Sequence, residues 1–172
     1  PVIIRHGTAT FEVIETKKNN KKFDAAIICA SGGGLTAGTS IVLKNHNPNC
    51  KIFTAEPAAW NDHQQSFLAN KRIYIKDVEH GICDALESPF PGIITFAINN
   101  KNKVKGLSVD DTEIIEAMRF AYEEFNFILE PSGAIALACL RSAKIKFKDK
   151  KILIMLSGEN ISKDRFYKYI AR

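Results

Sequence analysis

A short apolar run that ends at three glycines is the feature of this sequence that most constrains its fold. Residues 24–30 (DAAIICA) are apolar after the first position, and SGGG at 31–34 leads directly into a helical pattern at 35–45. A run this short that stops at glycine predicts a strand buried on both faces. A strand followed by a tight turn and a helix is typical of a parallel sheet covered by helices.

The rest of the chain repeats this alternation of strand and helix signals. We expect further strands at 51–55, 104–109 and 151–156, and further helices at 7–18, 60–69, 111–124, 132–144 and 162–170. Asp110 and Glu113 have the spacing of a capping box at the start of one helix. Residues 71–91 show no period, so no element is predicted there. The pattern predicts one α/β domain with a mostly parallel sheet and helices on both faces.

Composition argues against several classes of protein. The chain has 172 residues, 45% of them hydrophobic and 25% charged, which is usual for a globular domain with a sizeable core. No apolar run approaches the roughly 20 residues of a membrane span and no secretory signal is visible, so we expect a cytoplasmic protein without membrane contact. The net charge of +5 comes from lysines scattered along the sequence, which does not predict nucleic-acid binding. The four cysteines form no CxxC pair and are expected to be buried free thiols.

Ligands of open parallel sheets bind beyond the carboxyl ends of the strands, and the Gly-rich turn lies at such an end. Residues 31–35 can present successive backbone N–H groups to an anion such as a phosphate at the N-terminus of the next helix. The turn is neither a Walker loop nor a GxGxxG dinucleotide motif. The alternative interpretation is a tight turn that only allows the strand and the helix to pack closely.

Two other turns carry oxygen-bearing side chains. Glu56 ends one predicted strand and Asp62 follows six residues later, so both carboxylates are candidates for binding one divalent cation together with a backbone carbonyl between them. The alternative is that they are solvated or cap a helix. Ser157 follows the last strand and can bond a ring nitrogen or cap a turn, and Glu130 can face a cofactor or form a salt bridge.

Taken together, these segments resemble the C-terminal half of the fold type II pyridoxal-phosphate enzymes, in the branch of threonine/serine dehydratases, serine racemase and threo-3-hydroxyaspartate ammonia-lyases. The matching segments follow the family's order: VIIRHGTATFEVIE (2–15), SGGGLTAG (31–38), AEPAAWNDHQQSF (55–67), GICDAL (81–86), EIIEAMRF (113–120), LEPSGAIALA (129–138) and ILIMLSGEN (152–160). The resemblance implies pyridoxal 5′-phosphate as the cofactor. It implies β-elimination on a hydroxy amino acid such as threonine, serine or 3-hydroxyaspartate, which gives a 2-oxo acid and ammonia.

The resemblance also implies a role for each matching residue. The residues implied in cofactor binding are Ser31, Gly32, Gly33, Gly34 and Leu35 at the phosphate, and Ala85, Glu130, Ser157 and Asn160 around the ring. The residues implied in binding a divalent cation, Mg or Mn, are Glu56, Asp62 and the carbonyl of Trp60. A neutral hydroxyl at the pyridine nitrogen suits β-elimination, in which the leaving hydroxyl takes the electrons.

Several positions depart from the family's pattern. Ser31 replaces the first glycine of the phosphate loop, which requires a negative φ there. Ala85 adds a methyl group where the family has glycine, Arg5 adds a cation, and Glu159 replaces another glycine. The family's Schiff-base lysine, in a Ser-x-Lys-x-Arg-Gly motif, does not occur, so no catalytic residue is assigned to this chain.

We therefore expect a C-terminal, phosphate-binding portion of a dehydratase-like domain over 1–172, without a regulatory domain. A missing N-terminal half would complete it, as a separate chain or a removed segment, and a surface partly apolar would favour a homo-oligomer. Three alternatives remain open at this point: a serine racemase-like activity, a non-catalytic remnant that binds pyridoxal phosphate, and a nucleotide-binding α/β module.

Overall fold

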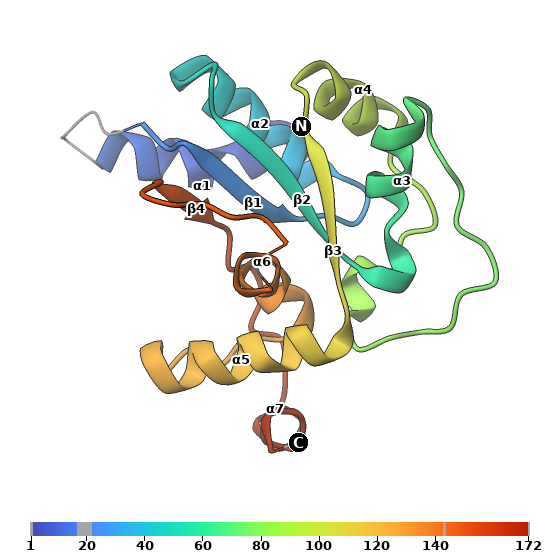
Figure 1. The fold of residues 1–172 in the computed structure, drawn as a ribbon, viewed down its shortest axis with the longest axis vertical. Coiled ribbons are helices and arrows are strands. Elements are labelled where there is room, and N and C mark those ends of the chain that lie inside the picture. The colour runs from blue at the N-terminus through green and yellow to red at the C-terminus, as the bar shows by residue number, and fades with distance from the viewer. Residues whose placement is uncertain (1, 17–21, 143, 172) are drawn as a thin grey trace.

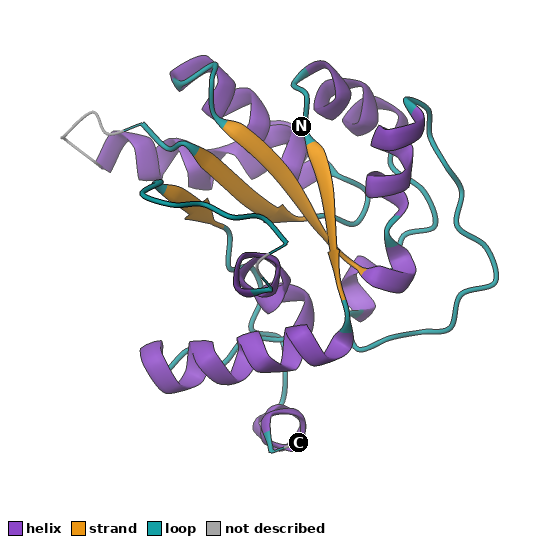
Figure 2. Ribbon diagram, in the orientation of Figure 1, coloured by secondary structure: helices purple, strands orange, loops and turns teal. Residues whose placement is uncertain are grey.

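The structure, a computed structural model, describes residues 2–16, 22–142 and 144–171, and every structural statement below concerns these residues. Their strands form one parallel sheet in the spatial order β3-β2-β1-β4. The strands are β1 (Ala25–Cys29), β2 (Lys51–Pro57), β3 (Lys105–Val109) and β4 (Ile152–Ile154). Figures 1 and 2 show this sheet between two groups of helices, so the predicted α/β architecture is confirmed.

Helices connect the strands and cover both faces of the sheet (Figure 1). The described α-helices are α1 (Val2–Thr16), α2 (Gly34–His46), α3 (Asp62–Ala69), α4 (Ile93–Lys101), α5 (Asp111–Phe125), α6 (Pro131–Arg141) and α7 (Lys163–Ile170). There are also two short 3-10 segments among the described residues: η1 (Ala58–Trp60) follows β2, and η2 (Asp84–Leu86) precedes α4. No described helix combines the length and the apolar composition that crossing a membrane requires.

The sequence pattern and the structure differ at several boundaries. The helix predicted at 7–18 begins at Val2, and its last predicted positions, 17–18, lie outside the described residues. The helix predicted at 132–144 ends at Arg141, with position 143 also outside them. The pattern does not predict α4, because Gly92 at its N-cap provides no side-chain cap and the helix starts with two β-branched residues.

The side chains of β1 alternate between two cores on opposite faces of the sheet. Ile27 and Cys29 belong to a large core formed with α5, α6 and α7, in which all of 131–139 is buried. Ala26 and Ile28 belong to a smaller core formed with α2. Successive side chains of a strand point to opposite faces, so a continuously apolar strand must be covered on both sides, as the sequence predicts.

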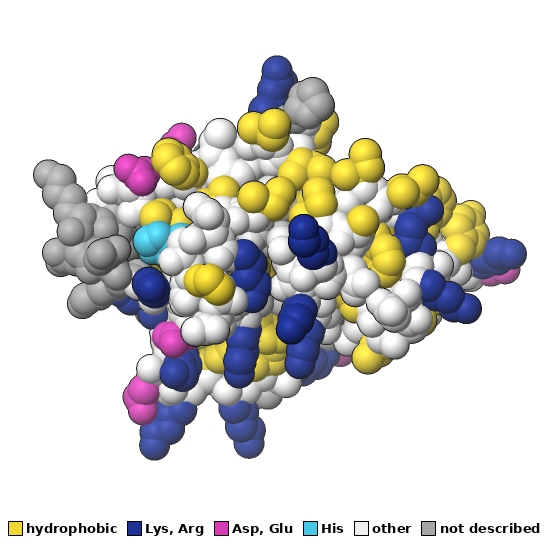
Figure 3. All heavy atoms as spheres, turned by 90° about the horizontal axis from the view of Figure 1, so that it is seen from above, with side chains coloured by type: hydrophobic (Ala, Val, Ile, Leu, Met, Phe, Trp, Pro, Cys, Tyr) yellow, Lys and Arg dark blue, Asp and Glu magenta, His cyan; other side chains and the backbone are white. Residues whose placement is uncertain are grey.

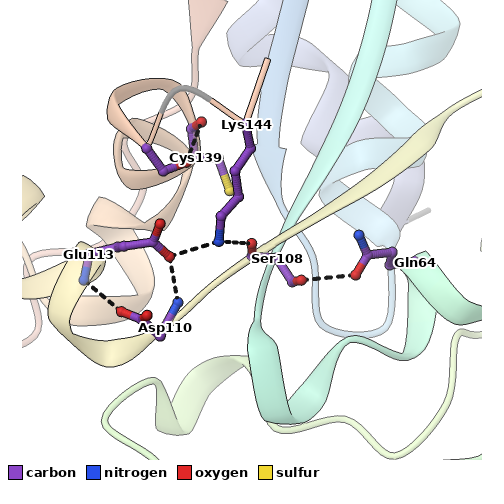
Figure 4. A network of polar contacts seen from close by, with 7 residues as sticks. Gln64, Ser108, Asp110, Glu113, Cys139 and Lys144 are labelled. Atoms are coloured by element: carbon purple, nitrogen blue, oxygen red, sulfur yellow. Dashed lines mark hydrogen bonds and ion pairs between the residues drawn. The ribbon is translucent and has the colours of Figure 1, made fainter.

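A polar network ties the end of β3 to α3 and α5 (Figure 4). The predicted capping box is confirmed: the Asp110 carboxylate accepts a bond from the Glu113 amide, and the Asp110 amide donates to the Glu113 carboxylate, both at 2.9 Å. The Lys144 ammonium donates to Glu113 and to the Ser108 carbonyl, both at 2.8 Å. The Ser108 hydroxyl donates to Gln64 on α3 at 2.8 Å, so the network fixes α3 against β3.

Lysines from distant parts of the sequence gather around a groove at the amino-terminal ends of the strands (Figure 3). The groove has a volume of about 780 Å³, and its floor includes Phe53 and Phe147, whose rings pack edge to face with centroids 6.0 Å apart. The lysines that line it are Lys44, Lys51, Lys103, Lys105, Lys146, Lys148 and Lys150. This groove lies at the opposite end of the strands from the candidate site.

Candidate functional site

The candidate site lies where the strand order changes direction, between β1 and β4. From β1 the chain moves outward to β2 and β3, and it then returns to place β4 on the other side of β1. The carboxyl ends at such a switch point are where open parallel sheets bind ligands. The Gly-rich turn follows β1 and Ser157 follows β4, and the structure brings Ser157 to the end of β1, just before the turn: the Cys29 Sγ lies 3.0 Å from the Ser157 Oγ.

The Gly-rich turn, residues 31–34, places a residue in the left-handed region directly before the N-terminus of a helix. Gly33 has a φ of 83°, in the left-handed region that favours glycine, and α2 begins at the next residue. Ser31 lies outside that region, so the condition for serine at this position is met. No side chain among the described residues caps α2, which leaves the first N–H groups of the helix available to a ligand. A Cβ atom on Gly32 would meet no atom within 4 Å, so the turn is open there.

Glu130 and Ser157, two of the residues predicted to lie around the ring, lie together at the end of β4 and form a second wall. A Cβ atom on Gly133 would lie 2.3 Å from the Ser157 carbonyl oxygen, so α6 begins in direct contact with this end of the strand. Glu130, the N-cap residue of α6, donates its amide to the Gly158 carbonyl at 3.3 Å, and its carboxylate lies against Gly158. Burial raises the pKa of Glu130, and a backbone hydrogen bond with Asn160 opposes that rise.

Glu56 and Asp62 form a buried pair of carboxyl groups with no exposed surface. Glu56, in β2, caps the N-terminus of α3, because its Oε1 accepts from the His63 amide at 2.7 Å and its Oε2 from the Gln64 amide at 2.9 Å. Both carboxylate oxygens of Asp62 lack a hydrogen-bond partner among the described residues. Burial raises the pKa of Glu56 and raises that of Asp62 to about 7. Without a counterion, the pair therefore holds a proton near neutral pH.

This pair fits an oxygen-ligated divalent cation. The two carboxylate oxygens of Asp62, buried and without a partner among the residues described, are the donors that Mg²⁺ and Mn²⁺ prefer. The predicted third ligand, the Trp60 carbonyl, lies in η1 just before α3. The described residues contain no group of three or more His, Cys, Asp or Glu side chains arranged to hold a metal. A cation at Asp62 would therefore complete its shell with carbonyl and water oxygens.

Ala85 and Asn160 lie on exposed segments near these walls. Ala85 is the middle residue of η2, which is anchored by the buried side chains of Cys83 and Leu86 on either side. The Ala85 methyl group is itself exposed. Contact of Ala85 and Asn160 with a cofactor stays a prediction.

Three polar side chains that sequence reasoning does not single out contact the carbonyl oxygens of the Gly-rich turn. They are His63 on α3 and Thr95 and Asn99 on α4. Burial lowers the pKa of His63 to about 4, so its ring is neutral at physiological pH. The only sequence signal for the α4 pair is its spacing of four residues, which places both side chains on one face of a helix.

Comparison with known proteins decides the family. The family described as "Pyridoxal-phosphate dependent enzyme" matches residues 1–158. The chain belongs to this family. A serine racemase from Schizosaccharomyces pombe is 32% identical over 171 residues, which cover 99% of this chain and 52% of the relative. An L-threo-3-hydroxyaspartate ammonia-lyase from Saccharomyces cerevisiae is 33% identical over 165 residues, or 96% of this chain and 49% of the relative.

Solved structures agree with this pyridoxal-phosphate family assignment. The structure of maize serine racemase matches with a TM-score of 0.84 and 33% identity, over 96% of this chain and 50% of that one. The processed form of threonine deaminase isoform 2 from Solanum lycopersicum matches with a TM-score of 0.83 and 28% identity, over 96% of this chain and 45% of that one. The resemblance and the fold read from the sequence are thus confirmed. The chain spans about half the length of the relatives it matches.

Proposed function

We propose that this chain forms the cofactor-phosphate and ring-nitrogen wall of a pyridoxal-phosphate-dependent lyase that acts on a hydroxy amino acid. The single observation that carries the proposal is the open Gly-rich turn at the sheet's switch point, with Ser157 brought beside it. Bound there, pyridoxal phosphate would supply the electron-accepting ring, and the substrate would be threonine, serine or 3-hydroxyaspartate.

The residues of this chain would bind and orient the cofactor. The N–H groups of residues 31–35, at the positive end of α2, would hold the phosphate. The Ser157 hydroxyl would bond the ring nitrogen without charging it, and Glu130 and Asn160 would lie along the ring's edge. Ala85 lies on the nearby η2 segment, where its methyl group replaces the glycine of the family.

A divalent cation would bind at Asp62 and Glu56, with the Trp60 carbonyl. It would neutralise the buried pair and hold the start of α3, from which the His63 side chain reaches the Gly-rich turn. The cation's role in this proposal is therefore structural.

The Schiff-base lysine would come from a region corresponding to the other half of the relatives. The rim of the Gly-rich turn carries apolar side chains suited to such a contact: Val2 and Ile4 on α1, and Ile93 and Ile94 on α4, are each more than 60% exposed. We expect the assembled enzyme to be a cytoplasmic homo-oligomer.

Titration by calorimetry with pyridoxamine 5′-phosphate tests cofactor binding by this chain. This ligand keeps the ring and the phosphate but lacks the aldehyde, so it does not react with surface lysines. We expect it to bind more tightly than pyridoxamine, ATP or NAD. A preference for either nucleotide would overturn the proposal in favour of a nucleotide-binding module.

Activity is tested on the chain assembled with the region that supplies the lysine. Serine, threonine and 3-hydroxyaspartate are offered, and both the 2-oxo acid and the D-amino acid are measured. Oxo-acid release supports the lyase. Formation of D-serine without oxo acid would replace it with a racemase, which the similarity to serine racemases favours as the second candidate. Neither product would indicate a non-catalytic remnant.

A further inference from the structure

Each carbonyl oxygen of the Gly-rich turn that precedes α2 is held by a side chain from another helix. The His63 Nε2 lies 2.8 Å from the first of these oxygens, on Ser31. The Thr95 hydroxyl donates to the second, on Gly32, at 2.5 Å, and the Gly92 amide donates to the same oxygen at 3.2 Å. The Asn99 amide group donates to the third, on residue 33, at 3.3 Å.

Holding these carbonyl oxygens fixes the direction of the N–H groups that follow them. A peptide unit is planar and trans, so its C=O and N–H bonds point in opposite directions. The carbonyls of residues 31, 32 and 33 are therefore rigidly linked to the N–H groups of residues 32, 33 and 34. Because side chains of α3 and α4 hold the carbonyls, each of these N–H groups points away from the group that holds its carbonyl, and an added Cβ atom on Gly32 would meet no atom within 4 Å.

The side chains that hold the turn are themselves held in place. His63 and Asn99 have no exposed surface. A Cβ atom on Gly33 would lie 2.5 Å from the His63 Cε1, so the ring packs directly against the turn, and Phe67 packs on the ring with centroids 5.6 Å apart. The Thr95 hydroxyl has a single hydrogen and two carbonyl acceptors within reach, and the contact with Gly32 at 2.5 Å is shorter than the contact with Gly92 at 3.1 Å.

We propose that His63, Thr95 and Asn99 are positioning residues that preorganise the Gly-rich turn for the cofactor phosphate. The inference rests on the proposed function, because it concerns the same turn and the same phosphate. An unheld peptide unit can rotate, and its N–H must then be ordered when the ligand binds. Holding the carbonyl beforehand removes that cost from the binding step.

The side chain of Thr95 allows a nearly isosteric test. Thr95→Val removes the hydroxyl and keeps the shape, and Thr95→Ser restores the hydroxyl as the matched control. Loss of one hydrogen bond of this kind should weaken binding of pyridoxamine 5′-phosphate roughly three- to tenfold in calorimetry. Thr95→Ser should bind within about twofold of the wild type. Binding of pyridoxamine, which has no phosphate, should be unchanged in both.

The phosphorus NMR signal of the bound ligand provides a readout that a purely structural role would not move. We expect the Thr95→Val signal to shift toward that of free pyridoxamine 5′-phosphate, while the Thr95→Ser signal stays at the wild-type position. A second pair, His63→Leu and His63→Gln, removes and restores a donor on α3 and should show the same contrast. Urea unfolding of each variant checks that the fold is retained.

The outcomes separate the two proposals. If wild-type protein binds pyridoxamine 5′-phosphate no better than pyridoxamine, the proposed phosphate site itself is wrong. If the wild type prefers the phosphate and the Thr95→Val and His63→Leu variants retain its affinity, the positioning inference is wrong. The inference is also overturned if Thr95→Ser binds as weakly as Thr95→Val, because the hydroxyl would then not be the cause.

Discussion

Replacing Asp62 with asparagine tests the buried acid pair most directly. The change keeps the size of the side chain and removes a charge whose two oxygens have no hydrogen-bond partner among the described residues. An asparagine at this position can also donate to Glu56 at any pH, which the aspartate cannot do once it is ionised. In protein freed of divalent cations, we therefore expect Asp62→Asn to stabilise the fold at alkaline pH.

The magnitude follows from the pKa of Asp62, which burial raises from 3.8 to about 7. The folded chain binds this proton more tightly than the unfolded chain. The stabilisation is thus fully present below about pH 4 and is lost as the pH rises through about 7. The difference between the unfolded and folded pKa values of Asp62 corresponds to a loss of about 4 kcal/mol in the free energy of unfolding at pH 8. This is an upper figure because Glu56 shares the proton. The free energy of unfolding of Asp62→Asn should therefore exceed that of the wild type by about 1–4 kcal/mol at pH 8 and equal it at pH 4.

Urea unfolding followed by circular dichroism at both pH values, in EDTA, measures this difference. Asp24→Asn is the control, because a hydrogen bond from the Lys151 backbone lowers the pKa of Asp24 and its replacement should not stabilise the protein at pH 8. Adding Mg²⁺ should stabilise the wild type and leave Asp62→Asn unchanged. If Asp62→Asn is less stable than the wild type at pH 8 in EDTA, the Asp62 carboxylate is not a desolvated group without a partner in the described part of the chain. If Mg²⁺ stabilises the wild type and Asp62→Asn equally, the cation site is refuted.

Three further predictions concern the turns and caps. Gly33→Ala should lower the free energy of unfolding in urea by about 1–3 kcal/mol, because alanine is strained at a φ of 83° and its Cβ would clash with His63. Gly32→Ala, the control, should leave that free energy unchanged, and equal losses in the two variants would contradict the described turn. Asp110→Ala should cost about 1 kcal/mol through loss of the capping box, and unchanged stability would argue against that cap. Ser157→Ala should weaken calorimetric binding of pyridoxamine 5′-phosphate and leave that of inorganic phosphate unchanged, and weakening of both would place the effect at the turn rather than the ring.

The sequence predicts most of the fold because its signals are local. The apolar run at 25–29 must be covered on both faces, and Asp110 and Glu113 can close a capping box without any tertiary partner. The Gly-rich turn and the carboxylates at 56 and 62 are also visible as residue types at strand ends. These signals were sufficient for the fold class and for the family resemblance.

Helix α4 shows where local signals end. Its first residues favour strand as much as helix, and its N-cap is a glycine without a capping side chain. Tertiary contacts decide its position, because Gly92 and Thr95 both bond the Gly32 carbonyl of the Gly-rich turn. The start of the helix is thus set partly by its hydrogen bonds to the Gly-rich turn. That turn lies about 60 residues earlier in the sequence, so the residues around 93–101 alone cannot predict the helix.

By itself, then, the sequence determined the alternation of strands and helices, the capped start of α5 and the residue types of the site. Only the tertiary structure decided that Ser157 meets the end of β1, and that the Asp62 carboxylate is buried with no hydrogen-bond partner in the described part of the chain. It also decided that His63, Thr95 and Asn99 hold the turn's carbonyl oxygens. It also gathered scattered lysines around one groove. The physical reason is that hydrogen bonds and burial depend on distances between segments, which packing of the two cores sets and local propensity does not.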